Sequence, residues 1–187
     1  MAMADVVASS SEPALGAIRL AWWREALQRL DQSAPPAEPR LQAVADHLLP
    51  HGITGDELAK LEDCWLALLE PFPWTNLTAE LILVRGRILF GLGARLLGLK
   101  AEEGEAAGAL WSLVDIARHC SDPASRNMLL DEARMSIAEL GPRKPPRSLR
   151  PLTALAAVAA HDVLGGSSPG RGMVALIHAL TGRFPRG

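Results

Sequence analysis

Residues 76–98 read NLTAELILVRGRILFGLGARLLG, the most apolar stretch of the chain, and they decide which fold to expect. Thr75 or Asn76 can cap a helix that runs to about Gly98, because their side-chain oxygens accept hydrogen bonds from free backbone amides. Three arginines interrupt the apolar run, at Arg85, Arg87 and Arg95. Since crossing a bilayer takes about 20 largely uncharged residues, we expect a helix at the centre of the fold and no transmembrane segment.

Capping residues, prolines and glycines divide the rest of the chain into further segments of helical period. The expected helices cover about residues 13–32, 41–49, 54–69, 102–120, 123–140, 151–164 and 168–181. No run alternates apolar and polar residues with the Val, Ile or Thr content of a strand. These patterns predict an all-α bundle of about eight helices that forms a single domain over residues 1–187.

Local signals indicate the buried face, the start and the end of several helices. In the first long helix, apolar side chains recur at steps of three and four and should face the core: Leu15, Ile18, Trp22, Ala26 and Leu30. Thr54 and Glu57 form a capping box, in which each side chain accepts a hydrogen bond from the other residue's backbone amide. The proline-rich stretch from Pro142 to Pro151 predicts an extended, solvated connection.

Composition and charge exclude several classes of protein. Nineteen Lys and Arg against 21 Asp and Glu give a net charge of −2, whereas a nucleic-acid binder normally needs a basic excess. Cys64 and Cys120 are too few for a disulfide framework. The first residues lack the basic and apolar regions of a secretory signal. We therefore expect a cytoplasmic protein with reduced thiols and no nucleic-acid partner.

Few residues could carry chemistry. His47 and His51 are separated by the helix-ending Pro50, and the neighbours His119 and Cys120 have no third metal ligand nearby in the sequence. The remaining acids that could bind Mg²⁺ are Glu62, Asp63, Asp115, Asp122, Asp131 and Glu132. No pair of aspartates is spaced D-x-x-x-D, so we expect these acids to be solvated or to cap helices.

Known nucleotide and hydrolase motifs are absent from the sequence. No P-loop or G-x-S-x-G elbow occurs, and the glycines at 91 and 93 lack the strand that a dinucleotide fingerprint requires. Within an apolar helix, the glycines at 86, 91, 93 and 98 favour close helix packing over room for a ligand.

Residues 11–27, SEPALGAIRLAWWREAL, resemble a string of the squalene/phytoene synthase family, all-α enzymes that join two prenyl diphosphates head to head. The double tryptophan followed by arginine is its most specific part. Residues 85–93 resemble the family's glycine-bearing helix beside the prenyl tunnel, and residues 108–118 resemble the helix that carries its second aspartate motif. The stretches 150–152 and 168–183 resemble short bacterial members. The resemblance implies an isoprenoid-synthase-like bundle whose ligand-binding residues are Trp22, Trp23, Arg24, Gly86, Phe90 and Arg118.

The chain departs from this family at the residues that bind metal. Only Asp5 is available where the family has its first Asp-rich helix, so we expect that helix to be lacking. In the second motif, His119 and Pro123 stand where aspartates belong, and the family's site tyrosines have no counterpart. Departure of a diphosphate depends on Mg²⁺ that neutralises the developing charge. We therefore expect no catalytic residue, no cofactor and loss of prenyl transfer.

Three hypotheses about function follow. The first is a pseudoenzyme of this family that binds a lipid or isoprenoid, or that works as an assembly-factor-like module. The alternative is an active farnesyl or geranylgeranyl diphosphate transferase of terpenoid biosynthesis, with Mg²⁺ held by Asp115 and Asp122 or by Glu62 and Asp63. The third is an unrelated helical interaction domain.

Two further expectations concern the missing Asp-rich helix and the tryptophan pair. An apolar groove left by that helix predicts a homodimer or a protein partner, in the cytoplasm or at a membrane surface. Neighbouring residues on a helix differ by about 100° in direction, so at most one of Trp22 and Trp23 can face fully inward.

Overall fold

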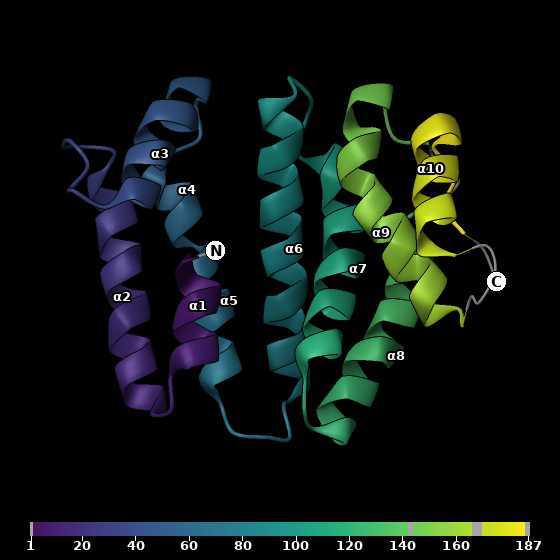
Figure 1. The fold of residues 1–187 in the computed structure, drawn as a ribbon, viewed down its shortest axis with the longest axis horizontal. Helices are drawn as coiled ribbons and strands as arrows, with labels where there is room; N and C mark the ends of the chain where they lie inside the picture. Colours follow the sequence, from purple (N-terminus) through teal and green to yellow (C-terminus); the bar gives the residue numbers. More distant parts are fainter. Residues whose placement is uncertain (1, 142–143, 166–169, 186–187) are drawn as a thin grey trace. The chain divides into compact units, whose positions relative to one another are not determined.

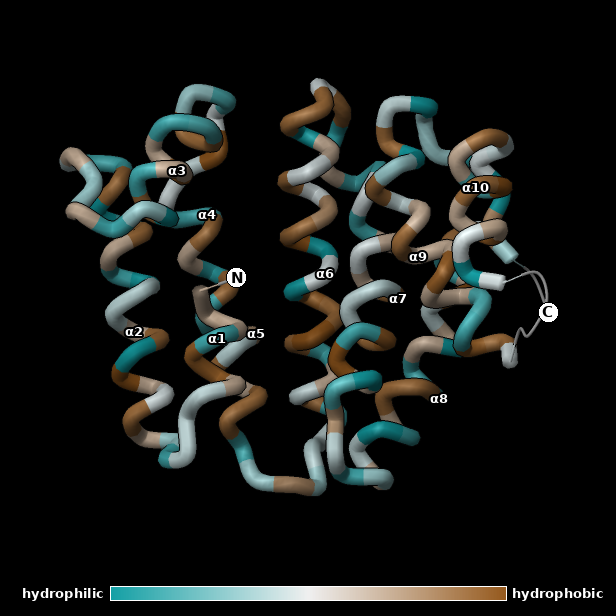
Figure 2. Tube along the Cα trace, viewed as in Figure 1, coloured by the Kyte–Doolittle hydropathy of each residue, from teal (hydrophilic) through white to brown (hydrophobic). Residues whose placement is uncertain are grey.

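A computed structural model describes residues 2–141, 144–165 and 170–185 of the chain. Over these residues the backbone forms helices α1 to α10 and short 3-10 turns, with no strand (Figure 1). Hydrophobic residues are interspersed with polar ones along the helices, as amphipathic packing requires (Figure 2). The predicted all-α architecture of about eight helices is confirmed.

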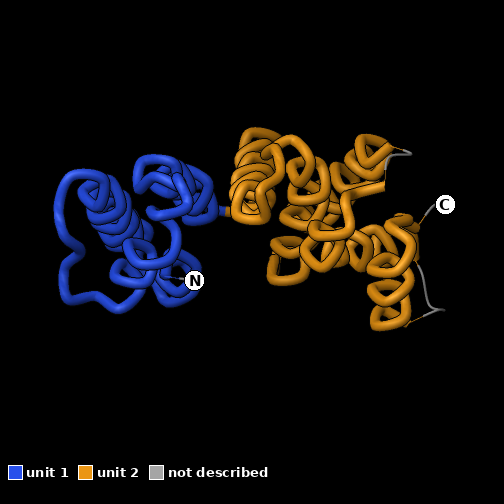
Figure 3. Tube along the Cα trace, turned by 90° about the horizontal axis from the view of Figure 1, so that it is seen from above, with its two compact units in different colours: residues 1–71 blue, residues 72–187 orange. Residues whose placement is uncertain are grey.

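The helices gather into two compact units, Met1–Pro71 and Phe72–Gly187 (Figure 3). The site residues expected from the sequence are distributed over both. Trp22, Trp23 and Arg24 belong to the first unit, and Gly86, Phe90 and Arg118 belong to the second. The organisation of residues 1–187 as a single domain stays a prediction.

The first unit is built around α2 (Pro13–Arg29), which packs against α1 (Ala2–Ser9), α4 (Gly55–Ala59) and α5 (Leu61–Leu66). A loop leads from α2 to α3 (Pro39–His47). A Cβ atom on Gly55 would lie 1.9 Å from the carbonyl oxygen of Leu27. Only glycine therefore fits where α4 meets α2, and the short α4 can lie directly against the longer helix.

The second unit begins with α6 (Asn76–Leu96), which pairs with α7 (Glu102–His119). It continues with α8 (Pro123–Glu139), α9 (Arg150–Val163) and α10 (Arg171–Thr181). Helix α7 packs against α6, α8 and α9, whereas α10 packs against α9. The most central helix of this unit is therefore α7, although the sequence favoured the more apolar α6 for that place.

Two glycines explain how closely α6 and α7 approach. A Cβ atom on Gly86 would lie 2.0 Å from the carbonyl oxygen of Gly108, and one on Gly108 would lie 2.1 Å from that of Gly86. Real Cβ atoms never come this close to an oxygen, so the two backbones touch at this pair. The position supports the packing interpretation of Gly86.

The buried face of α2 differs from the predicted one. The last two positions of the expected stripe are buried, but Leu15, Ile18 and Trp22 are 54%, 66% and 50% exposed. The helix reaches the core through Leu20 and Leu27 instead. Because α2 carries apolar residues on all sides, a spacing of three and four fits more than one face, and the sequence pattern selected the wrong one for the first two turns.

The helix expected over residues 54–69 is broken into shorter pieces. It divides at Lys60 into α4 and α5 and ends in a 3-10 turn over Ala67–Leu69. Its predicted start is confirmed. The backbone amide of Glu57 donates to Thr54 Oγ1 at 3.1 Å, and the amide of Thr54 donates to the Glu57 carboxylate at 3.0 Å.

The connection between α8 and α9 is more ordered than its prolines predicted. It contains a 3-10 turn over Arg147–Leu149, and Leu149 is fully buried. This leucine fixes the turn in the core, so the prediction of an extended, solvated segment is wrong here. Pro142, Arg143 and the expected helix start at Ser168–Pro169 lie outside the described residues.

Residues 2–9 form a helix, α1, that is not among the helices expected from the sequence. Helix α1 buries Met3 and Val6, and it packs against α2 and α5. Across the described ranges, no helix combines the length and the apolar content needed to cross a membrane.

Candidate functional site

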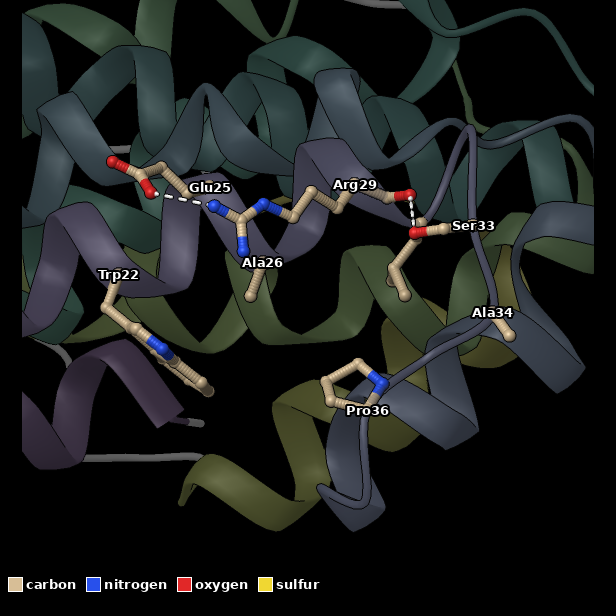
Figure 4. A pocket seen from close by; sticks show the side chains of 8 residues that line it. Trp22, Glu25, Ala26, Arg29, Ser33, Ala34 and Pro36 are labelled. Atoms are coloured by element: carbon tan, nitrogen blue, oxygen red, sulfur yellow. Dashed lines mark hydrogen bonds and ion pairs between the residues drawn. The ribbon is translucent and has the colours of Figure 1, made fainter.

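A pocket of about 310 Å³ lies beside the second half of α2 and the loop that follows it (Figure 4). The indole of Trp22 and the ring of Pro36 stand on opposite sides of this space, near Ala26. Its apolar lining consists of Trp22, Ala26, Leu30, Ala34 and Pro36. Ligand pockets typically measure about 300–1,000 Å³, so this one has room for part of an aliphatic chain.

Polar groups occupy one side of the pocket. Glu25, Arg29 and Ser33 complete the lining. Arg29 Nη2 donates to Glu25 Oε2 at 3.4 Å, and Ser33 Oγ donates to the Arg29 carbonyl oxygen at 3.0 Å. The Arg29 side chain is 75% exposed, and such surface ion pairs contribute at most about 0.5 kcal/mol. Arg29 can therefore exchange Glu25 for an anionic group at the pocket mouth.

The loop beside the pocket is fixed by the start of α3. Pro39 occupies the first turn of α3, where a missing amide hydrogen costs nothing. The Glu38 carboxylate accepts a hydrogen bond from the backbone amide of Leu41 at 2.8 Å and so caps the helix. The cap at one end and the Ser33 bond at the other hold the loop residues Ala34 and Pro36 at the pocket.

The two tryptophans of the motif occupy different surroundings. Their rings meet edge to face, with centroids 5.1 Å apart. Trp22 is 50% exposed and lines the pocket, whereas Trp23 is half-buried. This agrees with the expectation that the two cannot both face inward.

Arg24 ties two helices of the first unit together. Its Nη1 lies 3.7 Å from Oε2 of Glu62 on α5. Burial raises the pKa of the Glu62 carboxyl, and the charge of Arg24 acts in the opposite direction. Arg24 therefore stabilises a carboxylate that is otherwise poorly solvated, which is a structural role in the contact between α2 and α5.

A buried arginine organises the contact between α6 and α7. Arg85 is 1% exposed. Its Nε donates to Ser112 Oγ at 2.9 Å, and its Nη2 donates to Asp115 Oδ2 at 2.8 Å. The guanidinium carbon lies 5.3 Å from the ring centroid of Trp111, within cation–π distance. In the sequence, Arg85 stands out only as an interruption of an apolar run, so this site was not predicted.

The site residues expected in the second unit lie in its packed interior or in its ion pairs. Gly86 faces the α7 backbone. Phe90 is 2% exposed and contacts the Trp111 ring, with centroids 5.4 Å apart. Arg118 pairs with Asp162, which also accepts a hydrogen bond from Arg171 Nε at 2.8 Å.

Burial and two charged neighbours shift the pKa of Arg118. Burial lowers the pKa of its guanidinium, the nearby charge of Arg171 lowers it further, and Asp115 raises it. Both arginines converge on Asp162, whose side chain is 17% exposed. This cluster joins α7, α9 and α10 within the second unit.

The carboxylates of the alternative Mg²⁺ site have other partners. Asp115 pairs with Arg85. Asp122 Oδ2 accepts hydrogen bonds from the backbone amide and the hydroxyl of Ser125, both at 2.7 Å, and these bonds lower the pKa of Asp122. Asp122 thereby caps α8, which is one of the two roles expected for these acids. Among the residues that the structure describes, no three His, Cys, Asp or Glu side chains gather in a way that could hold a metal ion.

Comparison of the chain with models of protein families, with curated proteins and with solved structures gives no match. The structure brings Trp22 together with Arg29 and the loop around Pro36, and it brings Phe90 together with Arg85 and Trp111. The first group surrounds an open pocket, and the second fills a packed interior.

Proposed function

We propose that the chain is a helical binding protein, a squalene/phytoene synthase-like module without prenyl transfer that holds part of an isoprenoid or lipid chain beside Trp22. One observation carries the proposal. The first tryptophan of the Trp-Trp-Arg motif is half-exposed and forms a wall of the apolar pocket on α2.

The pocket lining suits an aliphatic chain with an anionic end. Each methylene group moved from water to an apolar surface contributes about 0.8 kcal/mol, and Trp22, Ala26 and Leu30 offer such a surface. Arg29 at the mouth supplies a cation for a diphosphate or carboxylate. A chain bound in this way needs no metal ion, which suits a protein in which Asp115, Asp122 and Glu62 are engaged by Arg85, Ser125 and Arg24.

Isothermal titration of the full chain with farnesyl diphosphate and with farnesol, each with and without Mg²⁺, tests the proposal. We expect both compounds to bind without Mg²⁺, and farnesyl diphosphate to bind more tightly because of Arg29. Trp22→Ala should weaken binding about tenfold, because aromatic side chains provide much of the contact energy in such sites.

Ile18→Ala is the matched control. Ile18 lies on the same helix and is 66% exposed, but it does not line the pocket, so binding should not change. Absence of heat from both compounds under all conditions would overturn the proposal. Release of pyrophosphate that requires Mg²⁺ would also overturn it and would establish the alternative, a prenyl transferase.

The proposal extends to partners and location. A binding protein of this kind would act in the cytoplasm or at a membrane surface, alone or as a homodimer or assembly-factor-like partner of another protein. Light scattering on the purified chain distinguishes a monomer from a dimer, and a clean monomer would remove the homodimer from the proposal.

A further inference from the structure

The charge of the chain is distributed very unevenly. Residues 140–187 contain seven Lys and Arg and one Asp or Glu, a net charge of +6. Residues 1–139 contain 12 Lys and Arg and 20 Asp and Glu, a net charge of −8. Such asymmetry indicates an anionic partner for the basic part, even though the chain as a whole is slightly acidic.

The same part of the chain exposes an apolar helix face. On α10, four large apolar side chains point to solvent at a helical spacing: Met173, Leu176, Ile177 and Leu180, which are 51%, 52%, 43% and 71% exposed. Figure 2 shows the hydrophobic character of this helix. No acidic residue occurs in α10, and its exposed side chains are apolar apart from those of Arg171 and Thr181.

The other face of α10 is firmly attached to α9. Val174 and His178 are buried, and His178 Nε2 lies 2.8 Å from Thr153 Oγ1. Its Nδ1 lies 3.0 Å from the carbonyl oxygen of Arg183. Arg150 donates from Nη1 to the Leu180 carbonyl oxygen at 2.8 Å. The exposed face therefore belongs to a helix that cannot turn it inward without breaking these bonds.

Basic residues lie at both ends of this helix. Arg171 opens the helix with a side chain that is 64% exposed, and Arg183 follows the helix end on the surface. Lys144 and Arg147, in the connection before α9, are also exposed. An apolar stripe with basic residues at its ends is the pattern of a helix that lies in the surface of an anionic bilayer.

We propose that α10 docks the protein on anionic membranes, with Met173, Leu176, Ile177 and Leu180 inserted between the lipids and with Arg171 and Arg183, at the two ends of the helix, against the headgroups. This membrane-docking proposal concerns other residues than the ligand pocket on α2, and it does not depend on that pocket. The apolar face supplies the insertion energy, and the net charge of +6 over residues 140–187 supplies selectivity for anionic lipids.

Flotation of the full chain with two kinds of vesicle tests the proposal. One kind is pure phosphatidylcholine, and the other contains phosphatidylglycerol in addition. We expect binding only to the anionic vesicles, weakened by salt because exposed charges are screened. Leu176→Gln with Leu180→Gln should reduce binding at least about tenfold, since two apolar side chains lose their burial in lipid.

The matched control is Leu15→Gln with Ile18→Gln. These side chains are also apolar and exposed, at 54% and 66%, but they lie in the acidic part of the chain and should leave vesicle binding unchanged. Arg183→Glu leaves the apolar face intact and should also weaken binding. Circular dichroism of each variant confirms that its helices are retained.

Insertion of α10 into the bilayer can be measured directly. Leu180→Trp should gain fluorescence quenching by brominated lipid that the unmodified chain lacks. Failure to float with anionic vesicles would overturn the proposal, as would equal losses in both double variants. A dimer in light scattering that dissociates in Leu176→Gln with Leu180→Gln, without any vesicle binding, would overturn it in favour of a second copy on this face.

Discussion

The contact between α6 and α7 and the pocket on α2 use similar residues in opposite ways. Each contains tryptophan, arginine and small residues, but Arg85 is 1% exposed and Trp22 is 50% exposed. At the first contact, two glycines bring the backbones together, and Arg85 and Phe90 are buried. At the second, a loop holds Pro36 away from the helix and leaves about 310 Å³ open.

This difference separates residues that stabilise the fold from residues that can bind. The resemblance to a known family implicated Gly86, Phe90 and Trp22 together. Packing divides this set, because Gly86 meets the α7 backbone and Phe90 is buried, whereas Trp22 borders a pocket. Substitutions at the first contact should therefore change stability, and substitutions at the second should change binding.

The largest loss of stability is expected for Gly86→Ala. The added Cβ would lie 2.0 Å from the carbonyl oxygen of Gly108, so α7 would have to move away from α6 over its length. We expect a loss of about 4 kcal/mol in the free energy of unfolding, the range of severe core substitutions. Urea unfolding followed by circular dichroism measures this loss.

Gly172→Ala is the control for that substitution. A Cβ atom there would meet nothing within 4 Å, and alanine favours a helix over glycine by about 0.5–1 kcal/mol. We expect a stability equal to or slightly above that of the unmodified chain. Equal unfolding midpoints for the two variants would show that the α6 and α7 backbones are not in contact.

A smaller loss is expected for Arg85→Met. The substitution keeps most of the side-chain volume, but it removes the hydrogen bonds to Ser112 and Asp115. Removing one partner of a buried ion pair costs about 3–5 kcal/mol, and we expect the lower end because Asp115 is 30% exposed and water can solvate it. The loss is again measured by urea unfolding.

Arg29→Met provides the comparison from the pocket. Arg29 is 75% exposed, so the loss of its pair with Glu25 should change stability by less than about 0.5 kcal/mol. If both arginine variants lose the same small amount, Arg85 does not stabilise the contact between α6 and α7 through its ion pair.

Much of the fold could be predicted because its signals are local. Pro13, Pro123 and the Thr54–Glu57 box indicate helix starts through a few neighbouring atoms, and each of these starts is found in the structure. The buried face of α2 could not be predicted, because it depends on which helices pack around it. The turn before α9 was missed for the same reason, since only tertiary contact shows that Leu149 is buried.

The candidate site was predictable only in part. Trp22 was found through its motif, but the pocket also needs Arg29 and the loop residues Ala34 and Pro36, which no sequence pattern places against it. Arg85 carried a usable signal, because it is one of three arginines in an apolar segment and any of them that is buried must find a partner. Ser112 and Asp115, three residues apart on the next helix, were the candidates to pair with it.

Apart from the comparison variants Gly172→Ala and Arg29→Met, the smallest losses of stability are expected at the tryptophan pair, where they test the assignment of α2 most directly. Full burial of one tryptophan would cost about 3–5 kcal/mol on truncation to alanine. The structure has neither ring fully buried, so we expect about 1–2 kcal/mol for Trp23→Ala and about 1 kcal/mol or less for Trp22→Ala. Thermal unfolding measures both losses.

The order of these two losses matters more than their size. Trp22 is half-exposed because it borders a pocket, so its truncation removes little packing but much of the surface that a ligand would contact. A variant that keeps its stability and loses binding is the signature of such a residue. If Trp22→Ala proves as destabilising as Trp23→Ala, then Trp22 is packed against protein in solution, and the space beside it is not available to a ligand.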